Sequence, residues 1–125
     1  MLLALLDNVS QQGRAPISAV VVKFGQFYER RKANGLLVER ASARMASVDG
    51  MSDSQVQRVM LEMPFEKFER RRFLSYARDL AFIRFEPRLW RQLDADDLAR
   101  LKTICEESVA KYYERLAQAS EEPAP

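Results

Sequence analysis

The chain has 125 residues, of which 47% are hydrophobic and 30% are charged. This composition excludes a disordered chain and predicts one globular domain with a single core of ordinary size. The net charge of +2 is small, but residues 14–92 carry sixteen Lys and Arg against nine Asp and Glu, whereas residues 93–125 carry four against eight. A basic body followed by an acidic end indicates that one side of the molecule faces a polyanion.

The sequence lacks the residues of most catalytic and metal sites. It has no histidine, which removes imidazole acid–base catalysis, the usual nucleophilic triads and most zinc sites. Cys105 is the only cysteine, so we expect it to be a structural residue and not a nucleophile. The glycines form no phosphate-binding loop, and the paired carboxylates are helix neighbours that point in different directions. We therefore predict no enzyme activity, no catalytic residue, no cofactor and no metal.

No stretch of the chain reaches the roughly 18 consecutive apolar residues that suggest a transmembrane helix. The opening MLLALLDNVSQQG has neither a basic leader nor a signal-peptide cleavage site. We therefore expect no membrane partner and no signal peptide. A lone cysteine fits a cytoplasmic protein.

Residues 1–13 predict a short helix that Gly13 stops. Its apolar residues are Leu2, Leu3, Leu5, Leu6 and Val9. A helix of this length is not stable alone, so it must pack on the domain or on a partner. Such a leucine cluster at a terminus is also typical of a domain cut from a larger chain.

A second helix is predicted from Ser18 to about Asn34, where Asn34-Gly35 is a typical stop. Its expected inward stripe is Val20, Phe24, Phe27, Tyr28 and Arg31. Residues 35–50 are interpreted as a loop, in which Leu37-Val38 could form a short strand that pairs with a later hairpin. Arg40 and Arg44 add positive charge to this loop.

The rest of the chain is organised around residues 51–93. Ser52 and Asp53 can cap the start of a helix. The apolar residues that follow at helical spacing are Val56, Val59, Met60 and Met63. Pro64 is expected to end this helix at a tight turn and to begin a second helix over residues 65–72.

Residues 73–85, FLSYARDLAFIRF, alternate with period two on both sides of a polar break, which predicts a β-hairpin. An alternative continues the preceding helix through Leu80 and leaves one short strand, Phe82 to Phe85. We favour the hairpin. The apolar cluster after it, which includes Trp90, is expected to close the core beneath the hairpin.

The last helix opens with three aspartates, which favour the positive end of the helix dipole. Its apolar face is Leu98, Leu101, Ile104, Cys105, Val109, Tyr112, Tyr113 and Leu116. We favour core packing for this face. The alternative is a dimer or inter-domain helix, because Tyr112, Tyr113 and Leu116 extend past what a three-helix body can cover.

These elements predict a mainly α fold, with a winged-helix-like three-helix core and a small β-hairpin, flanked by N- and C-terminal helices. The expected organisation is an N-terminal helix (1–13), a winged-helix-like domain (14–93), a C-terminal helix (94–118) and a disordered tail (119–125).

The spacing F-L-x-Y-x-x-x-L-x-x-I-x-F-x-P-x-L-W-x-x-L, preceded by S-D-x-x-V-x-x-x-x-L-x-x-P-F-x-x-F, resembles small winged-helix modules appended to bacterial DNA-processing and defence ATPases, helicases or nucleases. The resemblance covers about Ser18 to Leu93. It implies a DNA-facing or partner-docking accessory domain of a larger bacterial machine. The hairpin departs from the usual wing because its turn contains no glycine.

Two functions follow as hypotheses. In the first, the chain is a winged-helix nucleic-acid binder, with DNA favoured over RNA. Its phosphate-binding residues would be Lys67, Arg70, Arg71, Arg78 and Arg84. The alternative is that these residues form a solvated basic face with internal ion pairs such as Glu66–Arg70 and bind no nucleic acid.

In the second hypothesis, the chain is a protein-interaction module that forms a homodimer or joins a larger assembly without contacting nucleic acid. Its interaction residues would be Leu5, Tyr112, Tyr113 and Leu116. The two hypotheses are compatible, because winged-helix proteins often dimerise through terminal helices.

Overall fold

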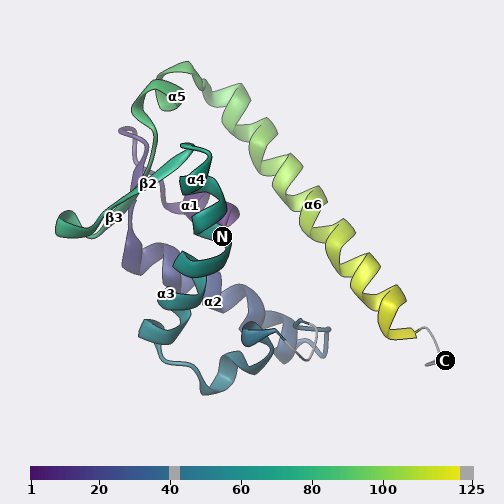
Figure 1. Ribbon diagram of the computed structural model, residues 1–125. Helices are drawn as coiled ribbons and strands as arrows, with labels where there is room; N and C mark the ends of the chain where they lie inside the picture. Colours follow the sequence, from purple (N-terminus) through teal and green to yellow (C-terminus); the bar gives the residue numbers. More distant parts are fainter. Residues whose placement is uncertain (40–42, 122–125) are drawn as a thin grey trace.

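Six α-helices and one small sheet make up the computed structural model, which describes residues 1–39 and 43–121 (Figure 1). The helices are α1 (Leu2–Asn8), α2 (Ile17–Ala33), α3 (Asp53–Met60), α4 (Glu66–Arg70), α5 (Pro87–Gln92) and α6 (Ala95–Glu121). The strands are β1 (Arg14–Pro16), β2 (Leu74–Ala77) and β3 (Phe82–Phe85). Two 3₁₀ segments, η1 (Arg44–Gly50) and η3 (Arg78–Leu80), and a π-helical turn, η2 (Leu61–Phe65), complete the described elements. The predicted mainly helical fold is confirmed.

The sheet is antiparallel, with β3 between β1 and β2. The predicted hairpin is confirmed as β2–β3, and the alternative of a helix through Leu80 is wrong. The prediction that Leu37-Val38 supplies the third strand is also wrong, because β1 pairs there with β3. Pro16 is tolerated in β1 because this strand lies at an edge, where a missing amide hydrogen costs no ladder bond.

The helix that starts at Asp53 is capped as predicted. The amide of Gln55 donates to Ser52 Oγ at 3.2 Å, and the amide of Ser52 donates to Gln55 Oε1 at 2.8 Å. The prediction that Pro64 ends this helix at a tight turn is wrong. The chain stays helical through η2 and continues as α4. A proline cannot donate the usual helical hydrogen bond, and the wider π turn accommodates its ring within one bent helix.

The π turn also explains a wrong prediction about which side chains face inward. Met63 was expected on the apolar face, but it is 50% exposed. An extra residue in one helical turn rotates the following positions about the helix axis, so the simple spacing fails there. Phe65, one position beyond Pro64, is buried. Helix α4 ends at Arg70, two residues earlier than predicted, and Arg72 has a left-handed φ of 60°.

The core joins residues from α1, β1, α2, η1, the bent helix and the inner sheet face. Its buried members are Ala4, Leu5, Ala15, Ile17, Val20, Val21, Phe24, Met45, Val48, Val56, Val59, Met60, Phe65, Leu74, Ile83 and Phe85. Of the predicted stripe on α2, Val20 and Phe24 are buried, and the residues at its far end are half-buried. Helix α1 is therefore part of the domain core.

Trp90 closes the core beside the sheet, as predicted. Its ring stacks on Phe85 with 5.3 Å between centroids, and its Nε1 donates to the Gln11 carbonyl at 2.9 Å. Helix α1 ends at Asn8, so Gly13 does not stop it as expected. Gly13 is needed instead because its φ is +77° and a Cβ there would lie 2.5 Å from Trp90 Cδ2.

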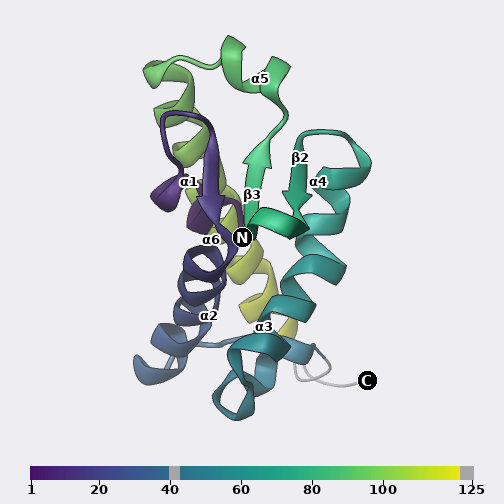
Figure 2. The same cartoon turned by 90° about the vertical axis from the view of Figure 1, so that its left-hand side faces the viewer.

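Helix α6 begins with a reciprocal cap, in which the Asp97 amide donates to Asp94 Oδ1 at 2.8 Å. Figures 1 and 2 place α6 and the β2–β3 hairpin on opposite sides of the molecule. The helix continues to Glu121, so the prediction of a disordered tail is wrong for residues 119–121. The rest of that predicted tail, residues 122–125, lies outside the described residues, as does Arg40.

Candidate nucleic-acid interface

The three predicted cations near α4 are all exposed. Arg70 Nη2 donates to Glu66 Oε2 at 2.9 Å. This is the internal ion pair expected if the basic face is only solvated. Both side chains are largely exposed, at 67% and 48%, so the pair contributes only about 0.3–0.5 kcal/mol. Lys67 and Arg71 have no acidic partner among residues 1–39 and 43–121. Within the described residues, α4 and its C-cap Arg71 therefore offer two unpaired cations and one weakly paired one.

The two predicted cations of the hairpin are also exposed. Arg78 lies at the tip, in η3, with its guanidinium 5.2 Å from the centre of the Tyr76 ring. Arg84 lies on the outer face of β3, and its Nε donates to Ser75 Oγ at 3.0 Å on the neighbouring strand. Neither arginine forms an ion pair within the described part of the chain. Their contacts hold the side chains in place and leave their charge available.

Sequence reasoning missed Arg14 as part of this surface. Arg14 is the register partner of Arg84 across β1 and β3, and both are exposed. The Arg14 guanidinium lies 5.1 Å from the centre of the Phe82 ring. The only local signal was an alternation over three residues, Arg14 to Pro16, which is too short to predict a strand.

These cations come from adjoining elements. Figure 2 shows α4 beside β2, with β3 and then β1 further along the sheet. Arg14 and Arg84 occupy the sheet face opposite the buried Ile83. The acidic helix α6 lies on the far side of the molecule (Figure 1). The basic residues of α4 and the sheet and the acidic residues of α6 thus lie on different sides of the molecule.

The residues predicted for protein contact are in different surroundings. Leu5 has no exposed surface, so its assignment as an interaction residue is corrected: a partner could not reach it while α1 stays packed. Tyr113 is half-buried, and its hydroxyl donates to the Val38 carbonyl at 2.8 Å. Tyr112 is 42% exposed and donates to Glu39, and Leu116 is half-buried. The tyrosines thus hold α6 against the chain's own residues 38–39.

Burial changes the acidity of the groups around α6. It raises the pKa of Tyr113 to about 12, with the charges of nearby Arg31 and Glu39 acting in opposite directions. The pKa of Tyr28 is raised further, again mainly by burial. Burial also raises the pKa of the Cys105 thiol, which makes the thiolate scarce at neutral pH. All three shifts move these groups further from neutral pH.

In the described part of the chain, no three His, Cys, Asp or Glu side chains gather closely enough to hold a metal ion. Every helix of the described residues is too short or too polar to span a membrane.

The structure thus defines a small, mainly helical domain with a three-stranded antiparallel sheet, exposed cations on α4 and the sheet, and an acidic helix opposite. Comparisons with protein families, with curated proteins and with solved structures found no match.

Proposed function

We propose that this chain is a non-catalytic, winged-helix-like module that binds duplex DNA. The observation that carries the proposal is the set of exposed cations on adjoining elements, without acidic partners in the described residues. These cations are Lys67 and Arg71 at α4, Arg78 and Arg84 on the hairpin, and Arg14 on β1. Such residues release the counterions of phosphates and give salt-dependent affinity.

The order of elements supports the winged-helix part of the proposal. Helix α1, strand β1, helix α2, the 3₁₀ segment η1 and the bent helix α3–α4 precede the hairpin, and β1 joins the hairpin as an edge strand. In this proposal the bent helix α3–α4 acts as the recognition helix and the hairpin acts as the wing. In helix-turn-helix proteins the recognition helix lies in the major groove of DNA.

The pairing of Arg14 with Arg84 is further support. Like charges directly opposite each other on neighbouring strands destabilise a sheet, and an anion bound on this face would lower that cost. The Arg14 guanidinium lies over Phe82 and the Arg84 guanidinium reaches Ser75 on β2, so the two cations would meet the DNA backbone at separate places on this face. Contacts of this kind position a protein on the backbone and carry little sequence information.

The test is fluorescence anisotropy with a labelled duplex of about 20 base pairs at about 50 mM salt, a range in which phosphate contacts are strong. Two double variants remove cations from the two elements: Lys67→Ala with Arg71→Ala, and Arg78→Ala with Arg84→Ala. Each should weaken binding at least about ten-fold, because a hydrogen bond to a charged group contributes about 1.5–3 kcal/mol.

The matched control is Arg100→Ala with Arg115→Ala, which removes two exposed arginines from α6. It should leave the affinity unchanged. A duplex RNA of the same sequence should bind less tightly, because the deep, narrow major groove of RNA excludes a helix. No binding by the wild-type protein, or equal losses in the control and the test variants, would reject the proposal.

A second candidate function is self-association through α6. Ile104 is 53% exposed on this helix, although it is a large apolar residue. In this alternative α6 pairs with α6 of a second copy and the chain makes no nucleic-acid contact. Sedimentation at high protein concentration would show a dimer that Ile104→Glu dissociates. A wild-type monomer under those conditions would rule it out.

A further inference from the structure

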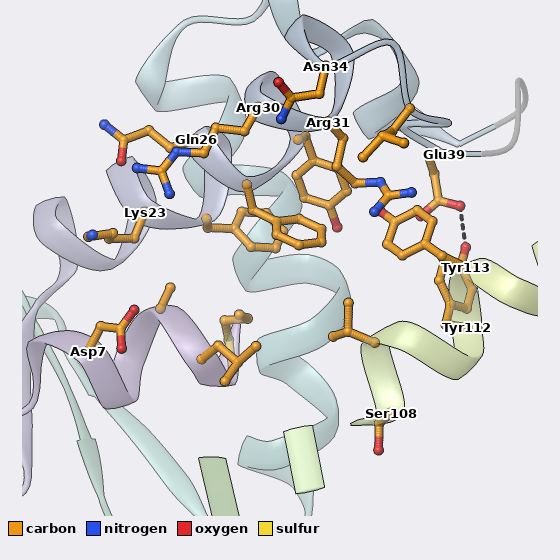
Figure 3. Close-up of a pocket in the computed structure, with 18 residues that line it drawn as sticks. Asp7, Lys23, Gln26, Arg30, Arg31, Asn34, Glu39, Ser108, Tyr112 and Tyr113 are labelled. Atoms are coloured by element: carbon orange, nitrogen blue, oxygen red, sulfur yellow. Dashed lines mark hydrogen bonds between the residues drawn. The ribbon is translucent and has the colours of Figure 1, made fainter. Parts of the chain in front are cut away.

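A cavity of about 500 Å³ lies between α1, α2 and the C-terminal half of α6 (Figure 3). This volume is within the range of small-molecule sites in proteins. The cavity is on the side of the molecule away from the hairpin, and it contains none of the cations assigned to DNA. The proposed DNA contact therefore does not account for this cavity.

The inner wall of the cavity is apolar and largely aromatic. Phe24 is 5% exposed, and its ring meets Tyr28 edge to face at 5.3 Å. Phe27 contacts the Tyr113 ring at 5.9 Å, and Val109 lines the cavity from α6. Rings packed against one another in this way form a rigid surface that suits a flat or branched apolar group.

The wall on the α6 side is held by specific contacts. The Arg31 guanidinium lies 3.4 Å from the centre of the Tyr113 ring, and its Nε donates to the Leu37 carbonyl at 2.6 Å. The Tyr113 hydroxyl donates to the Val38 carbonyl at 2.8 Å. The cavity is thus formed in the free protein, and a ligand would not need to order this wall on binding.

The mouth of the cavity carries unpaired positive charge. Lys23, Gln26 and Arg30 line it from one face of α2, because their spacing of three and four residues follows the helical repeat (Figure 3). Lys23 and Arg30 are exposed and have no ion pair within residues 1–39 and 43–121.

Two carboxylates also line the cavity. Asp7 Oδ1 lies 3.5 Å from Lys102 Nζ, and Glu39 accepts a hydrogen bond from Tyr112. Among the lining residues, the cations Lys23, Arg30 and Arg31 outnumber these two carboxylates, so the net charge of the lining is positive. An anion would be attracted to the mouth, and a cation would be repelled.

We infer that this cavity binds a small organic anion that has an aromatic or branched apolar body. The anionic group, a carboxylate, sulfonate or phosphate, contacts Lys23 and Arg30. The apolar body lies against Phe24, Phe27 and Val109. The inference is independent of the proposed DNA contact, because the two sites share no residue.

Three probes with the same ring and different charges test the inference by calorimetry: naphthalene sulfonate, naphthalene methanol and naphthylmethyl ammonium. The sulfonate should bind most tightly and the ammonium should not bind detectably. Lys23→Ala with Arg30→Ala should weaken the sulfonate at least about ten-fold, as expected for lost hydrogen bonds to a charged group, and should leave the alcohol unchanged. Val109→Trp should fill the cavity and weaken both.

Lys67→Ala with Arg71→Ala is the matched control, because it removes two exposed cations outside the cavity. It should bind the sulfonate like the wild type. Circular dichroism checks that each variant is folded. If Val109→Trp does not fold, the Lys23/Arg30 variant alone still tests the inference. The inference is overturned if the wild type does not bind the sulfonate at millimolar concentration, if the ammonium binds equally well, or if the Lys23/Arg30 variant retains full affinity.

Discussion

The body of the molecule, from α1 to β3, and its last helix, α6, are held in place by different interactions. In the body, Leu5, Met60 and Ile83 have no exposed surface. In α6, as far as Ala119, no side chain is fully buried. Leu101 of this helix packs against the core while remaining half-buried. Apolar burial therefore stabilises the body far more than it stabilises α6.

Polar contacts take a larger part in attaching α6. Near its start, Lys102 lies 3.5 Å from Asp7 of α1. Near its end, Tyr113 bonds to the Val38 carbonyl and stacks under Arg31. Between these attachments the helix does not close onto α2, which leaves the cavity. The same chain thus forms a tightly packed core in the body and a looser boundary at α6, where the cavity lies.

The largest effect should come from truncating a core residue of α1. Leu5→Ala should lower the free energy of unfolding by about 2–5 kcal/mol, as for other buried leucines. Ile104→Ala on α6 should change it by no more than about 0.5 kcal/mol, because Ile104 is 53% exposed. Urea titration measures both. Equal losses in the two variants would abolish the distinction between body and last helix.

A somewhat smaller loss of stability is expected on changing Gly13, which packs against the Trp90 ring. Gly13→Ala should cost about 2–4 kcal/mol, because it combines a left-handed φ with a clash against the indole. Gly35 has a similar φ of +69° but nothing within 4 Å of its Cβ position. Gly35→Ala should therefore cost only about 1 kcal/mol. If urea titrations show the same loss in the free energy of unfolding for both changes, the contact with Trp90 is not the reason that position 13 requires glycine.

The smallest effect concerns the attachment of α6 and its dependence on pH. Burial raises the pKa of Tyr113 to about 12, above the roughly 10 of an unfolded tyrosine. A raised pKa means that the folded state holds this proton more tightly. The stability from the protonated phenol is thus complete below about pH 10 and is lost as the pH rises through about 12.

The measurement is the free energy of unfolding at about pH 9 and about pH 11, on the two sides of the ordinary tyrosine pKa. The wild type should lose stability between these values, and Tyr113→Phe should lose less because it has no phenol to ionise. Tyr28, whose pKa is also raised, accounts for part of the remaining loss. If the variant loses as much stability as the wild type, the Tyr113 hydroxyl makes no pH-dependent contribution to stability.

Elements with a strong local pattern were predictable from the sequence. The hairpin follows from period-two alternation on both sides of a polar break, and the start of α3 follows from the Ser52 cap. Pro64 misled because the rule that proline ends a helix assumes α-helical geometry, and a π turn relieves the conflict. Strand β1 was missed because three residues carry no pattern, and the strand exists only through pairing with β3.

The candidate sites were predictable to different degrees. The exposure of Lys67, Arg71 and Arg84 follows from helix and strand periodicity, and so does the pairing of Glu66 with Arg70. The position of Arg14 opposite Arg84 depends on a contact between distant parts of the chain. The cavity could not be predicted at all, because it depends on how α6 crosses α1 and α2. Local residue spacing predicts which side chains share one face of a helix or strand. Tertiary packing determines which of these faces contact one another.

The salt dependence of DNA binding tests the central claim most directly. We predict that log Kd for duplex DNA rises linearly with log salt concentration, with a slope of about 0.9 for each phosphate contacted. Replacing Lys67, Arg71, Arg78 and Arg84 together by Ala should lower that slope by about 3–4, close to one for each cation removed. A variant with the wild-type slope would contradict the account, because the cations of α4 and the hairpin would then make no phosphate contacts.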